Sequence, residues 1–286
     1  MTARLATHAD VTDRTTHVLE RLEAADVDVE FVGALASDGD PLRALRDSTI
    51  DLALVGIGAL RGSAADDLTT VAVLPRMETR DVLVSLGARA VPMMSLVAGT
   101  RVGYVGARRG AFLAAHRPDV VGVRLDVTDL RALVEGRGDS SSNGGCDALV
   151  MSALDARQAG LVEATVEALE PKSWLPAPGQ GALALVARHP IAEATALDHL
   201  PTRTALRTEL ALLDALDAGD DATLGCLAQP SGRWIRLWAA SASPEGDRLV
   251  RSDLTGPLDE PEGLGAAVAR QMVDRGFALI PVQTLS

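Results

Sequence analysis

The 286-residue sequence has few aromatic residues, few cysteines and almost no lysine. Aromatic residues make up 2% of the chain, so its core has to be built from Ala, Val and Leu, whose small side chains suit close packing of helices on a sheet. Two cysteines, Cys146 and Cys226, do not make a disulfide framework, which favours a reducing compartment such as the cytoplasm. Five scattered histidines and two cysteines show no metal-ligand spacing, so we expect no metal site.

Long apolar runs and an excess of positive charge are also missing. No stretch reaches the unbroken length of a membrane span, and the first residues carry charges throughout, so we expect neither a membrane segment nor a secretory signal. A net charge of −12 disfavours nucleic acid as a partner. We therefore expect a cytoplasmic monomer whose partners are small molecules.

One region is locally basic within this acidic chain. Between Leu96 and Asp139, seven arginines stand against four aspartates and one glutamate. Guanidinium groups stay charged and bind carboxylates through two parallel hydrogen bonds, so the region favours a small anionic ligand. For any single arginine, a solvated helix face is an equally good interpretation. The seven are Arg101, Arg108, Arg109, Arg117, Arg124, Arg131 and Arg137.

Apolar runs alternate with helical periodicity over the first half of the chain. This alternation is typical of βαβ units and a parallel sheet, and it starts again near residue 100, which predicts two similar α/β lobes. Ligands of open α/β sheets bind outside the carboxyl ends of the strands, so the expected site is a cleft between the lobes. The predicted strands are 3–7, 29–35, 51–57, 100–106, 120–125 and 146–151, and the predicted helices are 12–25, 41–47, 108–118 and 127–136.

The remaining segments complete an α/β fold class with a small third domain. Apolar runs at 70–75 and 81–86 are expected to add antiparallel edge strands to the first lobe, and 181–188 to return to it. From Thr202 a long helix, a turn around Cys226, two strands and a final helix predict a small α+β C-terminal domain. The expected domains are 1–90 with 177–203, then 91–176, then 204–286.

Four ordered motifs go beyond generic strands and loops. They are RDVLVS (80–85), VGYVGARR (102–109), WLPAPGQGALALVAR (174–188) and LGCLAQP (224–230). They resemble R-D-A-F-V-S, V-G-T-S-S-L-R-R, P-A-x-G-Q-G-A and G-G-C-x-x-P of hydroxymethylbilane synthase, also called porphobilinogen deaminase. Each motif alone is weak, but together the resemblance covers nearly the whole chain. It implies two periplasmic-binding-protein-like lobes with a catalytic cleft between them and a third domain that presents a cysteine.

The resemblance implies an activity and a covalent cofactor. Members of the family condense porphobilinogen units, with release of ammonia, into a linear tetrapyrrole that leaves as hydroxymethylbilane. By resemblance, Cys226 joins a dipyrromethane cofactor through a thioether, and the glycine before it predicts an accessible sulfur on a turn. The alternative is that Cys226 is a small buried filler, as we expect for Cys146.

Further ligand-binding residues are implied in the same way. Arg108 and Arg109 match the family's arginine pair and would bind the acetate and propionate groups of pyrrole rings. Gln180 and Gly181 would bring polar groups and bare backbone close to the ligand. The candidates in a shortened family arginine motif are Arg124 and Arg131.

The first lobe departs from the family pattern. The family's H-S-M-K-D-V-P follows a strand that corresponds to DLALV, but this chain continues GIGALRG, so the catalytic aspartate falls on Ala59 and the lysine before it on Gly58. An alanine cannot stabilise positive charge on a pyrrole nitrogen, and losing such a partner costs on the order of a hundredfold in rate. Asp10 is a candidate substitute, although an N-cap of the first helix is the simpler interpretation of it.

Two functions therefore remain open. In the first, the chain is a hydroxymethylbilane synthase-like transferase, impaired because Ala59 replaces the aspartate. In the second, it is a non-catalytic relative that binds a pyrrole, a linear tetrapyrrole or another small carboxylated ligand. The retained motifs lie mostly in the second and third expected domains and the lost ones mostly in the first, which predicts that carboxylate binding persists while the deamination chemistry is impaired.

Overall fold

A computed structural model describes residues 2–8, 15–35, 40–60, 67–87, 90–127, 130, 145–219 and 221–277. The chain divides into two compact units, each with its own hydrophobic core. Unit 1 comprises Met1–Met77 with Gly179–Thr204, and unit 2 comprises Glu78–Pro178 with Ala205–Ser286. No helix among the described residues is both long enough and apolar enough to span a membrane.

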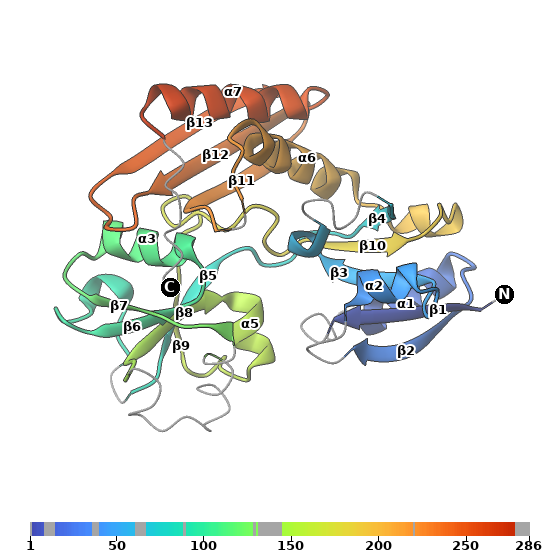
Figure 1. Cartoon of the computed structure of the whole chain (residues 1–286), viewed down its shortest axis with the longest axis horizontal. Helices are drawn as coiled ribbons and strands as arrows, with labels where there is room; N and C mark the ends of the chain where they lie inside the picture. Colours follow the sequence, from blue (N-terminus) through green and yellow to red (C-terminus); the bar gives the residue numbers. More distant parts are fainter. Residues whose placement is uncertain are drawn as a thin grey trace. The chain divides into compact units, whose positions relative to one another are not determined.

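Unit 1 is built on a five-stranded sheet of order β2-β1-β3-β10-β4 (Figure 1). β1 runs parallel to β2 and β3, whereas β10 is antiparallel to β3 and β4, so the run predicted at 181–188 does return to the first lobe. β3 is apolar and buried along most of its length because it is covered on both faces. The elements are β1 (Ala3–His8), α1 (Thr15–Ala24), β2 (Val29–Leu35), α2 (Pro41–Arg46), β3 (Leu52–Gly56), η2 (Ile57–Leu60), β4 (Thr69–Val73), β10 (Leu183–Ala187) and η5 (Glu193–Leu197).

The first sheet of unit 2 repeats this topology. Its order is β7-β6-β8-β5-β9, with β7 and β8 parallel to β6 and with β5 antiparallel to β8 and β9. The shared strand order confirms two similar α/β lobes. The elements are β5 (Asp81–Ser85), η4 (Met93–Ser95), β6 (Arg101–Tyr104), α3 (Ala107–His116), β7 (Val121–Arg124), β8 (Ala148–Ser152), α5 (Ala153–Gln158) and β9 (Thr165–Ala168).

This topology corrects the predicted domain boundary. The run at 81–86 was expected at the edge of the first lobe, but as β5 it lies inside the second sheet, between β8 and β9. The chain therefore leaves unit 1 at Met77 and not at residue 90. β9 was not predicted from the sequence, and the helix predicted at 127–136 lies mostly outside the described residues.

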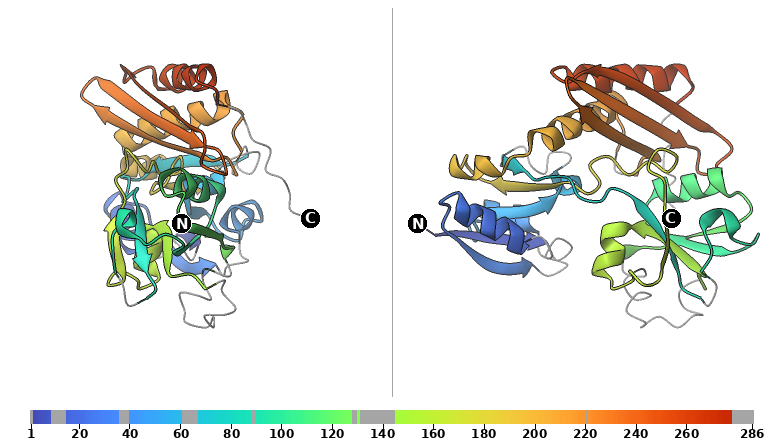
Figure 2. Two further views of the ribbon diagram at one scale, coloured as in Figure 1. Left: turned by 90° about the vertical axis from the view of Figure 1, so that its left-hand side faces the viewer. Right: turned by 180° about the vertical axis from the view of Figure 1, so that it is seen from behind.

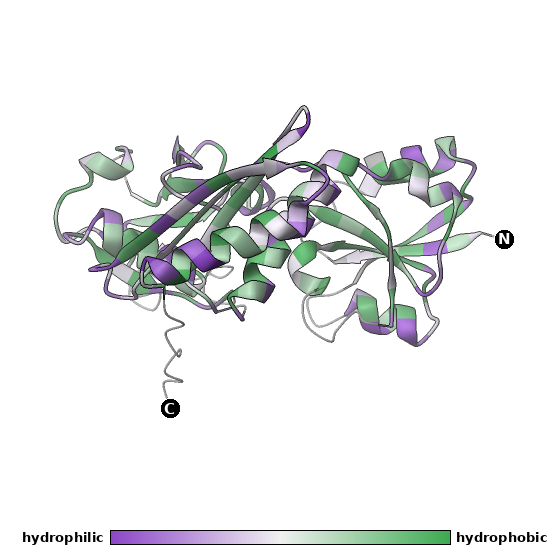
Figure 3. Ribbon diagram, turned by 90° about the horizontal axis from the view of Figure 1, so that it is seen from above, coloured by the Kyte–Doolittle hydropathy of each residue, from purple (hydrophilic) through white to green (hydrophobic). Residues whose placement is uncertain are grey.

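The C-terminal part of unit 2 has the α+β composition predicted for residues 204–286, but it belongs to the same compact unit as the second lobe. Its sheet has the order β11-β12-β13, with α6 and α7 on one face and α3 of the preceding lobe against the other (Figures 1 and 2). The helices mix hydrophobic and hydrophilic residues, as expected of elements with one face in a core (Figure 3). The bounds are α6 (Leu200–Ala215), β11 (Leu224–Ser231), β12 (Trp234–Ala242), β13 (Leu249–Pro257) and α7 (Pro261–Asp274).

A glycine between β12 and β13 sets how closely this hairpin approaches α3. A Cβ on Gly246, at φ +76°, would lie 2.3 Å from backbone atoms of Ala114 and Ala115. Because backbone cannot yield as a flexible side chain does, we expect Gly246→Ala to lower the free energy of unfolding by about 2–3 kcal/mol. Urea unfolding measures the loss. Gly232→Ala is the matched control, since Gly232 has φ +59° but nothing within 4 Å of its Cβ position. Equal losses in both variants would show that backbone strain alone, and not the contact with α3, is responsible.

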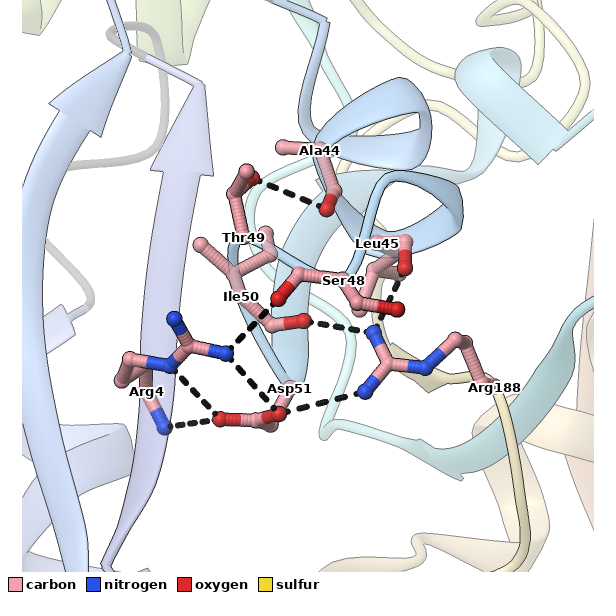
Figure 4. Close-up of polar contacts among 8 residues, drawn as sticks. All are labelled: Arg4, Ala44, Leu45, Ser48, Thr49, Ile50, Asp51 and Arg188. Atoms are coloured by element: carbon pink, nitrogen blue, oxygen red, sulfur yellow. Dashed lines mark hydrogen bonds and ion pairs between the residues drawn. The ribbon is translucent and has the colours of Figure 1, made fainter.

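Two arginines hold Asp51 at the start of β3 (Figure 4). Arg4 donates to Asp51 Oδ2 from its side-chain Nε, at 3.0 Å, and from its backbone N–H, at 2.9 Å, and Arg188 Nη2 donates to Oδ1 at 3.2 Å. The side-chain hydrogen bond from Arg4 is the largest cause that lowers the pKa of Asp51 from 3.8 to about 2. The cluster lies where β1 and β3 begin, away from their carboxyl ends, so we assign it a structural role.

The low pKa predicts a pH-dependent contribution to stability. Because the folded state depresses the pKa of Asp51, its contribution is complete above about pH 4 and is lost as the pH falls towards 2. At neutral pH we expect it to be about 1–2 kcal/mol after allowance for solvent screening. Urea unfolding of the wild type and of Asp51→Asn at pH 7 and pH 3 tests this. The difference between the two proteins should shrink at the lower pH, and a constant difference would contradict the assignment.

Candidate anion-binding site

Arg108 and Arg109 lie in the first turn of α3, directly after β6. The helix begins at Ala107 and has Gly106 at its N-cap, with φ +86°, so the chain turns sharply from strand to helix. This is the position that the sequence predicted for the pair. The first N–H groups of a helix have no partner within the helix, which adds to the preference of this turn for negative charge.

The two guanidinium groups converge on one buried carboxylate, Asp81 at the start of β5. Arg108 Nη2 donates to Asp81 Oδ2 at 2.7 Å, and Arg109 donates from Nε to Oδ2 at 3.2 Å and from Nη2 to Oδ1 at 3.0 Å. Trp174 Nε1 also donates to Oδ2, at 3.0 Å. Asp81 is 0% exposed. Asp81 was not among the site residues predicted from the sequence, although it stands second in the motif RDVLVS.

This cluster carries an excess of positive charge. Two guanidinium groups (+2) and one carboxylate (−1) leave a net charge of +1. Burial raises the pKa of Asp81, but the charges of Arg108 and Arg109 outweigh it and hold that pKa well below its usual range. Burial lowers the pKa of Arg108, whereas for Arg109 the attraction of Asp81 outweighs burial and raises the pKa. Asp155, whose side chain is exposed, adds a further attraction that raises the pKa of Arg109.

Residues 174–176, here named the strap, connect the arginine pair to β11. Arg108 Nη1 donates to the carbonyl of Leu175 at 2.7 Å, and the backbone N–H of Cys226 donates to the carbonyl of Pro176 at 2.9 Å. A Cβ on Gly225 would lie 2.6 Å from the Leu175 carbonyl oxygen. The glycine before the cysteine therefore allows two backbone segments to approach closely, and it does not form a turn.

Cys226 is enclosed in the core of the C-terminal domain. It lies within β11, packs in one apolar cluster with Ala228 and Leu237, and is 0% exposed. The predicted turn with an accessible sulfur is therefore wrong for this structure, because Gly225 and Cys226 pair with β12 on one side and meet the strap on the other. A thiolate at Cys226 would nevertheless raise the pKa of Arg108, so the two groups lie within electrostatic range. Cys146 is half-buried and packs against the apolar cluster of the second lobe, as expected.

Gln180, Gly181 and Ala59 belong to unit 1, where they share one edge of the sheet. Gly181 has φ +79°, and the carbonyl of Gln180 accepts from Arg76 Nε at 3.0 Å. The 179–181 turn adjoins η2, because the N–H of Ile57 donates to the carbonyl of residue 182 at 3.2 Å. Ala59 is exposed in η2, just past the carboxyl end of β3. The structure thus groups these three residues, and separately groups the arginine pair with Cys226.

Of the three remaining site residues predicted from the sequence, Arg124 lies within the described part of the chain. Arg124 ends β7 beside Tyr104 of β6, at the same edge of the sheet as the start of α3, and its side chain is exposed. Burial raises the pKa of Tyr104, and the charge of Arg124 opposes that shift. Arg131 and Asp10 lie outside the described residues. Within the described part of the chain, no three His, Cys, Asp or Glu side chains are grouped as metal ligands.

Comparisons with known proteins place these features in one family. A family model described as porphobilinogen deaminase, dipyrromethane cofactor binding domain, matches residues 40–196. The chain is 32% identical over 295 residues to the porphobilinogen deaminase of Stenotrophomonas maltophilia (strain K279a), with 92% of each chain covered. It is 33% identical over 283 residues to the porphobilinogen deaminase of Thermus thermophilus, again with 92% of each covered. Among solved structures, the lipoprotein Tp32 of Treponema pallidum has a TM-score of 0.46 at 16% identity, over 77% of this chain and 97% of that one.

Proposed function

Because this chain belongs to the porphobilinogen deaminase family, we propose that it is a hydroxymethylbilane synthase-like transferase with strongly impaired turnover of porphobilinogen. The observation that carries the ligand assignment is the cluster of Arg108, Arg109 and Asp81, which is buried and keeps one positive charge in excess. Acetate and propionate groups of a pyrrole supply the missing negative charge and accept paired hydrogen bonds from guanidinium groups.

Arg108 and Arg109 have different roles in this proposal. Arg109 is the more exposed, with 15% of its side chain accessible against 7% for Arg108. We therefore assign contact with the ligand carboxylate to Arg109, and assign to Arg108 the task of holding the strap through Leu175.

The turnover of porphobilinogen is impaired in this proposal because Ala59 stands where the family has an aspartate. Removal of an amine from the pyrrole side chain places positive charge on the ring nitrogen, and a carboxylate beside that nitrogen would stabilise it. The methyl group of Ala59 offers no such charge, and the loss of a preorganised electrostatic partner costs on the order of a hundredfold or more in rate. Ligand binding by unit 2 does not depend on this residue.

The cofactor that the family model names does not fit Cys226 as this structure has it. A thioether at that sulfur needs open space beside it, but Cys226 has no exposed surface and its side chain packs in the apolar core with Ala228 and Leu237. The Leu175 carbonyl also lies directly against Gly225. Dipyrromethane would supply the growing end of a pyrrole chain, and here the residues that surround Cys226 would first have to separate. This enclosure adds a second cause of impairment. It also favours a second function, in which the chain binds pyrrole carboxylates without turnover.

Consumption of porphobilinogen, measured beside the Stenotrophomonas maltophilia relative, tests the proposal. We expect this chain to bind porphobilinogen and to turn it over at least about a hundredfold more slowly than the relative. Equal turnover would contradict the impairment. Binding with no turnover would select the second function, and the absence of both binding and turnover would reject both functions.

A further inference from the structure

We propose that the open half of the C-terminal sheet is a docking surface for a short acidic segment of another protein. The open half comprises the exposed residues on the face of β11, β12 and β13 opposite α6 and α7, which are Gln229, Ser231, Trp234, Arg236, Asp253 and Thr255. The inference goes beyond the proposed function, because none of these residues belongs to the buried arginine cluster.

The alternation of side chains along β12 defines this face. Leu237 packs in the core formed with α6 and α7, so Arg236 and Trp238 on either side of it lie on the opposite face. Farther along the strand, Ala240 is buried in the cluster that includes Phe112 of α3. α3 therefore covers the end of the sheet beside the β12–β13 hairpin (Figure 2), and the other end keeps its outer face exposed.

Cations are stacked on both tryptophans of this face. Arg233 lies over the ring of Trp234, with 5.4 Å from Cζ to the ring centroid, and Arg236 lies over Trp238 at 4.8 Å. Lys172, the only lysine of the chain, places its Nζ 5.3 Å from the centroid of Trp238. Three of the four cation–π contacts among the described residues are therefore gathered at one face of one small sheet.

The same face carries an excess of positive charge. Asp253 accepts hydrogen bonds from Nε and Nη2 of Arg236, and about half of each side chain is exposed. Among the described residues, no carboxylate lies within ion-pair distance of Arg233 or Lys172. Three cations (+3) and one carboxylate (−1) leave a net charge of +2 in a chain whose total is −12, so the sign of this face is opposite to that of the whole protein.

The stacked cations are prepared to bind carboxylates. A guanidinium group that lays its face on an aromatic ring still presents its N–H edge, and the ring limits the side-chain freedom that binding would otherwise remove. Nη1 of Arg236 has no hydrogen-bond partner within the part of the chain that the structure describes. Aspartate and glutamate side chains match such an edge because each carboxylate accepts paired hydrogen bonds.

The form of the open half favours a protein segment over other anions. Small-molecule sites are concave and bury most of their ligand, whereas these residues share one exposed face of a sheet. Tryptophan and arginine are the residue types that contribute most to binding at protein–protein interfaces. A charge excess of +2 suits a segment with two or three carboxylates, and it is small beside the roughly 6–10 phosphate contacts of a nucleic-acid site.

Peptide binding tests the charge of this surface. The fluorescence anisotropy of a labelled hexaglutamate peptide at low ionic strength should show binding to the wild-type protein. We expect the double variant Arg233→Gln with Arg236→Gln to raise the Kd at least about tenfold, because both stacked guanidinium groups are lost. The charge-matched control is Arg43→Gln with Arg207→Gln, which removes two exposed arginines elsewhere and should leave the Kd nearly unchanged.

A second variant tests the aromatic ring separately from the charge. Trp234→Ala keeps every cation but removes the ring under Arg233, so we expect a Kd at least about threefold higher. Val273→Ala, which shortens an exposed apolar side chain of the same unit, should bind the peptide as the wild type does. The substituted side chains are exposed, so circular dichroism should show the same fold in all of these variants.

The remaining outcomes each reject the proposal. Failure of the wild type to bind the peptide would overturn it, as would equal weakening in the charge-matched control or an unchanged Kd in both the double variant and Trp234→Ala. Self-association that the double variant abolishes would assign the open half to a second copy of this chain. Binding to phosphatidylserine vesicles without binding to the peptide would assign it to a membrane. Porphobilinogen binding should be the same in the wild type and the double variant, so failure of the proposed function is seen separately.

Discussion

Replacement of Asp81 by alanine is expected to lower the free energy of unfolding by about 3–5 kcal/mol, because two buried guanidinium groups lose their shared carboxylate. Asp81 accepts hydrogen bonds from Arg108, Arg109 and Trp174, and all of them come from parts of the chain distant in sequence from β5. The variant leaves two like charges buried side by side and an indole N–H without its acceptor. We expect the largest loss of stability among the substitutions considered.

Urea unfolding followed by circular dichroism measures this loss. Asp253→Ala is the matched control, since Asp253 pairs with Arg236 in the same unit but about half of each side chain is exposed. Exposed pairs contribute about 0–1 kcal/mol, so the control should be nearly neutral. A loss below about 1 kcal/mol in Asp81→Ala would show that the arginine pair does not depend on this carboxylate.

Restoring a carboxylate at position 59 should produce the largest gain of activity. We expect the double variant Gly58→Lys with Ala59→Asp to turn over porphobilinogen about a hundredfold faster than the wild type, because it returns the charge that stabilises the pyrrole nitrogen. The structure leaves space for the new side chains at positions 58 and 59. Ala59 is exposed, and no atom lies within 4 Å of a Cβ on Gly58.

The uncharged counterpart is the control for this gain. Gly58→Lys with Ala59→Asn has nearly the same shape but no negative charge, so it should stay close to the wild-type rate. Equal gains in both variants would show that shape, and not charge, limits turnover. No gain in the aspartate variant would show that the missing carboxylate is not the limiting defect.

Much of the fold could be predicted because its signals are local. A buried strand such as β3 is a continuous apolar run, and α2 opens with Pro41, so both elements were predicted within about two residues. Pairing partners are not local. β5 lies close in sequence to β4 but pairs with β8 and β9, because register and burial in the second lobe, and not proximity in the chain, decide the partner.

In the site, too, features with a local sequence signal were predicted, and contacts between distant segments were not. The motif VGYVGARR located the arginine pair at a turn from strand to helix, because a glycine before a helix and two cations after it are visible in the sequence. Asp81 was missed, because an aspartate at the start of an apolar run reads as an exposed strand end until the fold buries it. Gly225 was misread because glycine serves both turns and close backbone contacts, and only the position of Leu175 distinguishes the two.

Binding of porphobilinogen to an Arg109→Met variant tests most directly whether the excess charge of the buried cluster is there for a ligand carboxylate. The variant leaves Asp81 paired with Arg108, so the cluster becomes neutral. Isothermal titration should show a Kd for porphobilinogen at least about tenfold higher than that of the wild type. Arg236→Met, which removes an arginine elsewhere in unit 2, should bind as the wild type does. An unchanged Kd in Arg109→Met would contradict the account.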